Sequence, residues 1–171
     1  MNPRNLKRKE PGFTVLEICV VLAASLALVG AAVPVLNTVL NQYRLTLAAQ
    51  NITTQLQFAR MKAVSSNESF RLNFPAGQRF YQVETAAGDV ISGPFFLPPG
   101  INLNAIDTGQ DVTFGGRFVS FSATGDAAAV GNGSAGRVKI INQLGGRIDI
   151  LVGTAGIVRQ TPAYRNPPAP F

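Results

Sequence analysis

The chain has 171 residues, a formal net charge of +6 and an apolar content of 46%. This length suits one compact domain plus an anchoring segment and is too short for two large cores. Histidine is absent and Cys19 is the only cysteine, which excludes an internal disulfide, a histidine–cysteine zinc site and a histidine base. The acidic residues of the later part stand singly in the sequence, at Glu68, Glu84, Asp89, Asp107, Asp111, Asp126 and Asp149. No pair among them suggests an acid–base couple or a calcium loop, so the sequence predicts neither an enzyme nor a cofactor or metal site.

An uncharged apolar stretch follows a basic amino end. Arg4, Lys7, Arg8 and Lys9 precede the segment Ile18–Leu36, which carries no formal charge. A helix of about 20 apolar residues spans the hydrocarbon core of a bilayer. Basic residues before such a span keep that end in the cytoplasm, so the chain beyond the span is predicted to lie on the other side of the membrane.

A secretory signal peptide is the alternative interpretation of this region. Ile18–Val29 would be its apolar part and Gly30-Ala31-Ala32 its cleavage site, so that a soluble mature protein would begin at Val33. Glu17 argues against this interpretation, because a carboxylate at the edge of an apolar run is costly unless it finds a partner. A functional role of Glu17 explains its position better than a signal peptide does.

The residues around Glu17 resemble the type III signal of type IV pilins and type II secretion pseudopilins. Gly12-Phe13-Thr14-Val15-Leu16-Glu17 stands between the basic leader and the apolar stretch. The resemblance implies that a prepilin peptidase cuts between Gly12 and Phe13 and that the new terminal Phe13 is N-methylated. It also implies an assembly glutamate fifth in the mature chain, which is Glu17 here, and a helix-kinking proline, which is Pro34 here.

For two of these residues, physical reasoning supports a role independently of the resemblance. Glu17 lies about one helical turn from the amine that cleavage would create at Phe13, so in a filament its carboxylate can pair with the amine of a neighbouring subunit. The pair is strong where permittivity is low and an unpaired charge is costly, so Glu17 would set the register of stacked subunits. Pro34 removes one helical hydrogen bond, which predicts a bend.

Beyond Pro34 the pattern predicts that the helix continues in amphipathic form. Apolar residues recur at steps of three and four, at Leu45, Ala49, Ile52, Leu56, Ala59 and Ala63. This spacing marks one face of a helix, and packing under a sheet explains it. A coiled-coil partner is the alternative, but the stripe is short and rich in alanine. A helix from about Phe13 to Val64 would be about 75 Å long.

The end of this helix narrows the resemblance to the GspH/FimT branch of minor pilins and pseudopilins. In that branch a leucine-x-x-alanine-arginine-x-x-alanine helix end leads into the first strand. The matching residues are Leu56, Ala59, Arg60 and Ala63, followed by Phe70–Phe74.

After Asn67 the sequence alternates apolar and polar residues between turns, which predicts strands. The predicted strands are Phe70–Phe74, Phe80–Thr85, Val112–Phe114, Arg117–Phe121, Arg137–Asn142, Arg147–Val152 and Ile157–Gln160, with a turn at Gly153–Gly156. Together with the helix they predict an α+β, pilin-like fold in which the long helix packs on an antiparallel β-sheet domain. The Pro-rich tail from Gln160 is expected to wander over the surface.

Basic residues near the carboxyl end allow a nucleic-acid hypothesis. They are Arg137, Lys139, Arg147, Arg159 and Arg165. Some FimT-type minor pilins are associated with DNA uptake through basic residues near their carboxyl ends, and a few phosphate contacts would give salt-sensitive binding. Solvent-facing charge on strands explains the same pattern without DNA. Arg159 and Arg165 are the candidate contacts.

The sequence thus predicts five segments: a cleaved leader (1–12), a transmembrane and filament-core helix (13–36), its amphipathic continuation (37–66), an antiparallel β domain (67–160) and a Pro-rich tail (161–171). It predicts a minor pseudopilin of a type II secretion system, a single-pass protein of the bacterial inner membrane whose periplasmic domain is built into a pseudopilus. Its partners would be the prepilin peptidase and N-methyltransferase and other pilin or pseudopilin subunits. A type IV pilus minor pilin, acting in assembly or DNA uptake, is the alternative.

Overall fold

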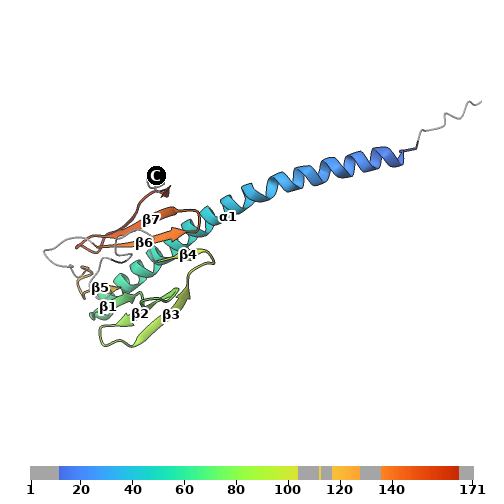
Figure 1. The fold of residues 1–171 in the computed structure, drawn as a ribbon. Helices are drawn as coiled ribbons and strands as arrows, with labels where there is room; N and C mark the ends of the chain where they lie inside the picture. The colour runs from blue at the N-terminus through green and yellow to red at the C-terminus, as the bar shows by residue number, and fades with distance from the viewer. Residues whose placement is uncertain (1–11, 104–111, 113–116, 128–135, 166–171) are drawn as a thin grey trace, which may run out of the picture. The chain divides into compact units, whose positions relative to one another are not determined.

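The structure of the chain is a computed structural model that describes residues 12–103, 112, 117–127 and 136–165. One long helix, α1 (Val15–Ser66), precedes the strands. These are β1 (Phe70–Asn73), β2 (Phe80–Thr85), β3 (Val90–Phe96), β4 (Ile101–Asn102), β5 (Phe118–Phe121), β6 (Gly136–Asn142), β7 (Gly146–Val152), β8 (Val158–Gln160) and β9 (Tyr164–Arg165). The chain divides into two compact units between Asn37 and Thr38. The first holds the amino half of α1, and the second holds the carboxyl half of α1 with all of these strands (Figure 1).

The amino half of α1 is exposed along its whole length. Thr14 caps the helix, since its Oγ1 accepts a hydrogen bond of 3.2 Å from the backbone N–H of Glu17. The hydroxyl of Ser25 donates to the carbonyl of Val21 at 2.8 Å, so this polar group is satisfied within the helix. An 18-residue window of α1 has a mean hydropathy of 2.5, and the helix is long and apolar enough to cross a membrane.

The carboxyl half of α1 is amphipathic, as the sequence predicts. Its buried residues are Leu45, Ala48, Ala49, Ile52, Leu56, Ala59 and Ala63. Alanine at four of these positions lets strands approach the helix closely, while the larger side chains fill the space between them. The predicted packing stripe is therefore confirmed, and α1 begins and ends within two residues of the predicted limits.

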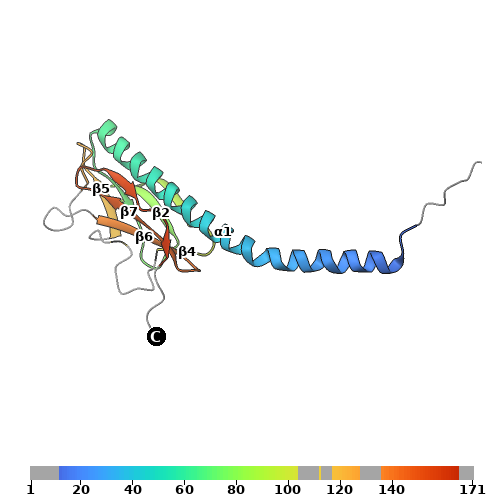
Figure 2. The ribbon, with the colours of Figure 1, turned by 90° about the horizontal axis from the view of Figure 1, so that it is seen from above.

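Two antiparallel sheets pack against this half of α1. The first has the strand order β3-β2-β1-β5, and the second has the order β4-β6-β7-β8, with β9 also paired to β7. All pairings among the described strands are antiparallel. Figure 2 shows the carboxyl half of α1 lying along one side of these strands. The predicted α+β, pilin-like arrangement is confirmed.

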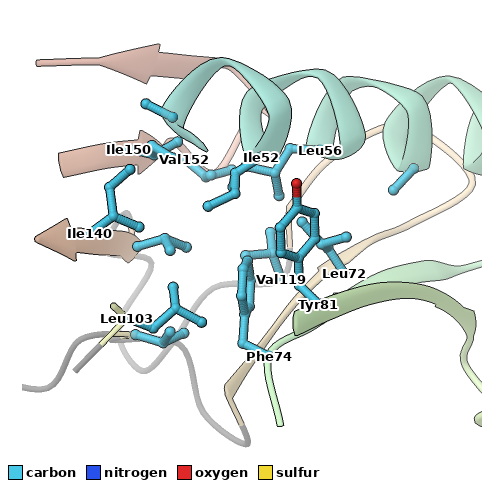
Figure 3. Packing of buried hydrophobic residues seen from close by; sticks show 14 of the residues in the cluster. Ile52, Leu56, Leu72, Phe74, Tyr81, Leu103, Val119, Ile140, Ile150 and Val152 are labelled. Atoms are coloured by element: carbon cyan, nitrogen blue, oxygen red, sulfur yellow. The ribbon is translucent and has the colours of Figure 1, made fainter. Parts of the chain in front are cut away.

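Side chains from both sheets meet α1 in one hydrophobic core. Ile52 and Leu56 are fully buried and point from the helix toward the strands (Figure 3). The residues that the sheets contribute include Leu72, Val83 and Val119 from the first sheet and Val138, Ile140 and Ile150 from the second. Tyr81 also belongs to this core, with its ring centroid 5.9 Å from that of Phe74. Burial raises the pKa of Tyr81 to about 12, because the anionic form would lose its hydration.

Most of the predicted strands are present, and their ends agree within one residue. Of the predicted strand Val112–Phe114 only Val112 lies in the described residues, where it forms a bridge with Val138. Three strands were not predicted. β3 contains Gly93-Pro94 and is largely exposed, so its sequence lacks the alternation of a half-buried strand. β4 and β9 have two residues each, too few for a periodic signal.

The side chain of Arg60 ties the end of α1 to two turns. Its Nε donates to the carbonyl of Gly125 at 3.0 Å, and its Nη2 donates to the carbonyl of Ala155 at 3.1 Å. The second turn is the predicted one at Gly153–Gly156, closed by a hydrogen bond from the N–H of Gly156 to the carbonyl of Gly153. Gly156 has a φ of +70°, and a Cβ added to it would overlap the carbonyl oxygen of Gly125. This close approach therefore requires glycine.

Replacing Gly156 by alanine is expected to destabilise the chain more than replacing Gly77 by alanine. Both glycines have positive φ, +70° and +72°, so each substitution carries a cost of about 1–2 kcal/mol for the left-handed conformation. A Cβ at Gly77 meets no atom within 4 Å, whereas the overlap at Gly156 adds about 1–3 kcal/mol. Urea unfolding of the full chain in detergent, followed by circular dichroism, measures both free energies. Equal losses would contradict the tight contact at Gly156.

A buried carboxylate is enclosed by polar side chains on the first sheet. Glu84 is 3% exposed and accepts hydrogen bonds from Arg71 Nε at 2.8 Å, Asn73 Nδ2 at 2.9 Å and Gln82 Nε2 at 2.6 Å. Burial alone would raise the pKa of Glu84. The three hydrogen bonds and the charge of Arg71 together outweigh burial, so this pKa lies below its ordinary value of 4.5.

The lowered pKa of Glu84 predicts acid sensitivity of the fold. The group contributes stability above the unfolded-state pKa of about 4.5, and this contribution is lost as the pH falls through the lower folded-state pKa. Glu84→Gln is expected to lose about 1–3 kcal/mol at pH 7, because the substitution weakens three hydrogen bonds to a charged group. Its free energy of unfolding should also change less between pH 6 and pH 3 than that of the wild type. Parallel pH profiles for the two proteins would refute this role of Glu84.

Candidate assembly site

The residues of the predicted cleavage site lie immediately before α1, outside any helix or strand. A Cβ added at Gly12 would meet no atom within 4 Å. The side chain of Phe13 is 79% exposed. The bond between them therefore lies in an open segment, a position in which an enzyme can reach a peptide bond.

Glu17 lies in the first turn of α1, where the helix dipole favours a negative charge. It is the only charged residue of α1 before Arg44. Its side chain is exposed, and it forms no ion pair with any residue that the structure describes. The helix thus presents one carboxylate at the end of a surface that is otherwise uncharged.

Pro34 lies inside α1, with helical residues on both sides of it. Its nitrogen has no hydrogen to donate to the carbonyl of Gly30 four residues earlier. A Cβ added at Gly30 would meet no atom within 4 Å, so no side chain crowds this turn of the helix. The bend at Pro34 stays a prediction.

The two candidate DNA contacts lie on neighbouring short strands. Arg159 is exposed in β8 and pairs in register with Leu151, whereas Arg165 belongs to β9 and pairs with Gly146. Leu151 and Gly146 lie toward opposite ends of β7, so the two arginines are separated by roughly 15 Å along the edge of that strand. The structure does not bring these two positions together.

Asp149, which sequence reasoning did not single out, lies beside two of the other basic residues. Asp149 Oδ2 accepts a hydrogen bond of 2.8 Å from the hydroxyl of Tyr164. Arg137 Nη1 and Arg147 Nε lie 3.8 Å from the two carboxylate oxygens, and the Arg147 guanidinium lies over the Tyr164 ring. Burial, and then the hydrogen bond to Asp149, raises the pKa of Tyr164. Asp149 thus joins Tyr164 of β9 and Arg137 of β6 to β7, beside Arg147 of its own strand.

This cluster corrects two expectations from the sequence. Lys139 is only 3% exposed, so the interpretation of the basic residues as solvent-facing charge is wrong for this residue. The tail does not wander over the surface throughout, because β9 pairs with β7 and Thr161 exchanges hydrogen bonds with the backbone of Asp149. Lys139 lies opposite Asp149 in the register of β6 and β7. A hairpin register inferred from the sequence could have pointed to this pair. The sequence alone does not show that several basic residues share one acidic partner.

The described residues offer no arrangement for catalysis by a metal. No group of three or more His, Cys, Asp or Glu residues among them could hold a metal ion. Glu84 and Asp149, the buried carboxylates in this part of the chain, are engaged in hydrogen bonds that join strands.

Comparisons with known proteins agree with this geometry. Residues 48–156 match the family described as type II transport protein GspH. The fold is similar to that of the type IV minor pilin FimU of Pseudomonas aeruginosa in two crystal forms. One has a TM-score of 0.54 and 16% identity, covering 72% of this chain and 94% of that chain. The other has a TM-score of 0.51 and 17% identity, covering 70% and 97%.

The minor pseudopilin EpsH of Vibrio cholerae gives a TM-score of 0.48 at 11% identity, covering 69% of this chain and 96% of that chain. A search of curated proteins found no match. The family match covers more than half of the chain, from the carboxyl half of α1 to the turn after β7. The chain therefore belongs to the family described as type II transport protein GspH, and it shares its fold with the type IV minor pilin FimU.

Proposed function

We propose that this protein is a minor pseudopilin of a type II secretion system, a structural subunit of a pseudopilus anchored in the bacterial inner membrane. The observation that carries the proposal is the exposed, uncharged amino half of α1 with Glu17 at its start, joined to a domain of the GspH family. An apolar helix of this length must be covered by lipid or by other subunits. Cover by lipid explains membrane anchoring, and later cover by other subunits explains assembly.

In this proposal the leader 1–12 stays in the cytoplasm, residues 13–36 form the membrane and filament-core helix, and residues 37–66 continue it under the β domain (67–160) and the tail (161–171). A prepilin peptidase cuts between Gly12 and Phe13, and the same machinery methylates the new amino terminus. The domain then lies in the periplasm, where it joins other pilin or pseudopilin subunits. Glu17 pairs with the terminal amine of a neighbour and fixes the register.

The mature amino terminus is expected to be an N-methylated phenylalanine at Phe13. Intact-mass measurement and amino-terminal sequencing of the protein purified from membranes would show this. Expression without a prepilin peptidase should leave the leader in place. A mature chain that begins at Val33 would instead show a secretory signal peptide and would rule out the anchored subunit.

Glu17→Gln is expected to reduce incorporation into filaments by about tenfold or more, because an uncharged amide cannot neutralise the terminal amine of a neighbour. The variant should remain cleaved and membrane-bound, which separates assembly from processing. Immunoblots of sheared filaments and of membranes measure the two pools. Thr14→Ser, which keeps the helix cap beside Glu17, is the matched control. Wild-type incorporation of Glu17→Gln would remove Glu17 from the assembly mechanism.

A minor pilin of a type IV pilus is the second candidate, since the signal, the helix and the fold suit both systems. Deletion of the gene separates them, because either secretion or a pilus function is lost. DNA uptake is less well supported, since Arg137 and Arg147 both lie beside Asp149. A mobility-shift assay that compares the wild type with Arg159→Ala and Arg165→Ala tests whether these two arginines bind DNA.

A further inference from the structure

Three uncharged segments come together at one end of the β domain. They are residues 38–43 of α1, residues 97–101, which lead into β4, and residues 142–146 around the turn between β6 and β7. Thr38 and Gln42 line a hollow of about 320 Å³ together with Leu144. A Cβ added at Gly100 would lie 3.6 Å from Asn41 Oδ1. Figure 1 shows the loop into β4 and the turn between β6 and β7 at the same end of the strands. These three segments are called the base.

The surface of the base mixes apolar with uncharged polar side chains. Its exposed large apolar residues are Val39, Leu40, Tyr43 and Leu144. Gln42 and Gln143 are exposed as well, and none of the three segments carries a formal charge. Tyrosine beside apolar residues is typical of the layer in which a bilayer meets water. The composition of the base therefore suits that layer.

An arginine borders each segment of the base. Arg44 follows the first segment and Arg147 follows the third. Arg79 Nη2 donates hydrogen bonds of 3.0 and 3.2 Å to two backbone carbonyls of the second segment. Asp149, which lies beside Arg147, is only 6% exposed. The rim of the base is thus positive, and arginine is well suited to bind the phosphates of lipid headgroups.

The exposed carboxylates of the domain, among its described residues, lie at the opposite end. They are Glu68, Asp89 and Asp126. The first comes directly after α1, and the last adjoins Gly125, whose carbonyl accepts a hydrogen bond from Arg60 near the end of the helix. The turn before Asp89 is joined to the same end by a hydrogen bond from the N–H of Ala86 to the carbonyl of Ser69. An anionic surface would therefore attract the base and repel the far end of the domain.

The position of the base along α1 matches the depth of a headgroup layer. The uncharged segment Ile18–Leu36 ends two residues before Thr38. At 1.5 Å per residue this segment is about 28 Å long, which is close to the thickness of the hydrocarbon core. Residues 38–43 continue the helix for about 3–10 Å beyond it, a distance similar to the depth of the headgroup layer.

We propose that the base is a membrane-docking surface, which rests in the headgroup layer of the bilayer that α1 spans. This inference rests on the proposed function, in which the amino half of α1 is the membrane anchor. Continuity with the anchor and the charge distribution along the domain select lipid as the occupant. The domain then turns one fixed face to the membrane before assembly, and incorporation into a filament releases that face.

Single tryptophans test the inference, because the chain contains no tryptophan of its own. Leu144→Trp reports on the base, Leu28→Trp on the anchor and Ile157→Trp on the far end of the domain. All three side chains are exposed, so the variants should melt near the temperature of the wild type; Gln143→Trp is a second reporter of the base. Each full-length variant is placed at low density in vesicles of phosphatidylethanolamine and phosphatidylglycerol that contain a lipid with a spin-labelled headgroup.

The fluorescence at position 144 is expected to be quenched by this lipid at least about threefold more strongly than that at position 157. The reason is distance, since Ile157 shares a hollow with Met61, which lies about 35 Å from Thr38 along α1. Iodide in the water should quench position 157 more strongly than position 144.

The anchor reporter separates the two hypotheses. Equal lipid quenching at positions 144 and 157 would overturn membrane docking, and so would shielding of position 144 from iodide without quenching by lipid, which would indicate cover by protein. If position 28 is at the same time protected from iodide by the bilayer, the proposed anchoring is unaffected. Free access of iodide to position 28 would instead overturn the anchor and the docking surface together.

Discussion

The structure depends on the burial of one face of α1. Ile52 and Leu56 lie at the centre of that face, and both sheets contribute side chains to the core beside them. Neither sheet is large, and several strands have four residues or fewer, so the sheets gain much of their buried apolar area from the shared helix. Arg60 and the turn at Gly156 hold the end of the helix against loops from both sheets. The fold is thus organised around one helix rather than around a sandwich of sheets.

The two halves of α1 differ in how much of their surface is buried. Its amino half exposes apolar side chains on every side, whereas its carboxyl half has one buried face and one exposed face. The change occurs in sequence between Leu36 and Leu45, where the first buried residue appears. Many of the large apolar residues exposed in the described part of the chain lie on this helix, and such a surface is typical of a contact with other chains or with lipid. The buried carboxylates link strands to one another. Glu84 joins β1 to β2, and Asp149 holds β9 on β7.

The helix and most strands could be predicted because their signals are local. A period of three to four residues marks the buried face of α1, and alternation marks β1, β2, β6 and β7. β3 was not predicted because Gly93-Pro94 interrupts an exposed edge strand. β9 was not predicted because it has only two residues and is held by a hydrogen bond from its Tyr164 to Asp149, which lies 15 residues earlier in the chain. The candidate assembly residues came from a short motif near the amino end.

The hydroxyl group of Ser25 has a consequence for the transfer of α1 from a bilayer to a filament that the proposed function requires. Ser25 donates to the carbonyl of Val21 in its own helix, so it need not exchange partners when the surroundings of the amino half of α1 change from hydrocarbon to protein. In the proposed function, assembly would replace one apolar environment of this half of α1 by another of similar polarity. Glu17 would then be the group whose electrostatic surroundings change most, and the helix would keep its backbone hydrogen bonds throughout.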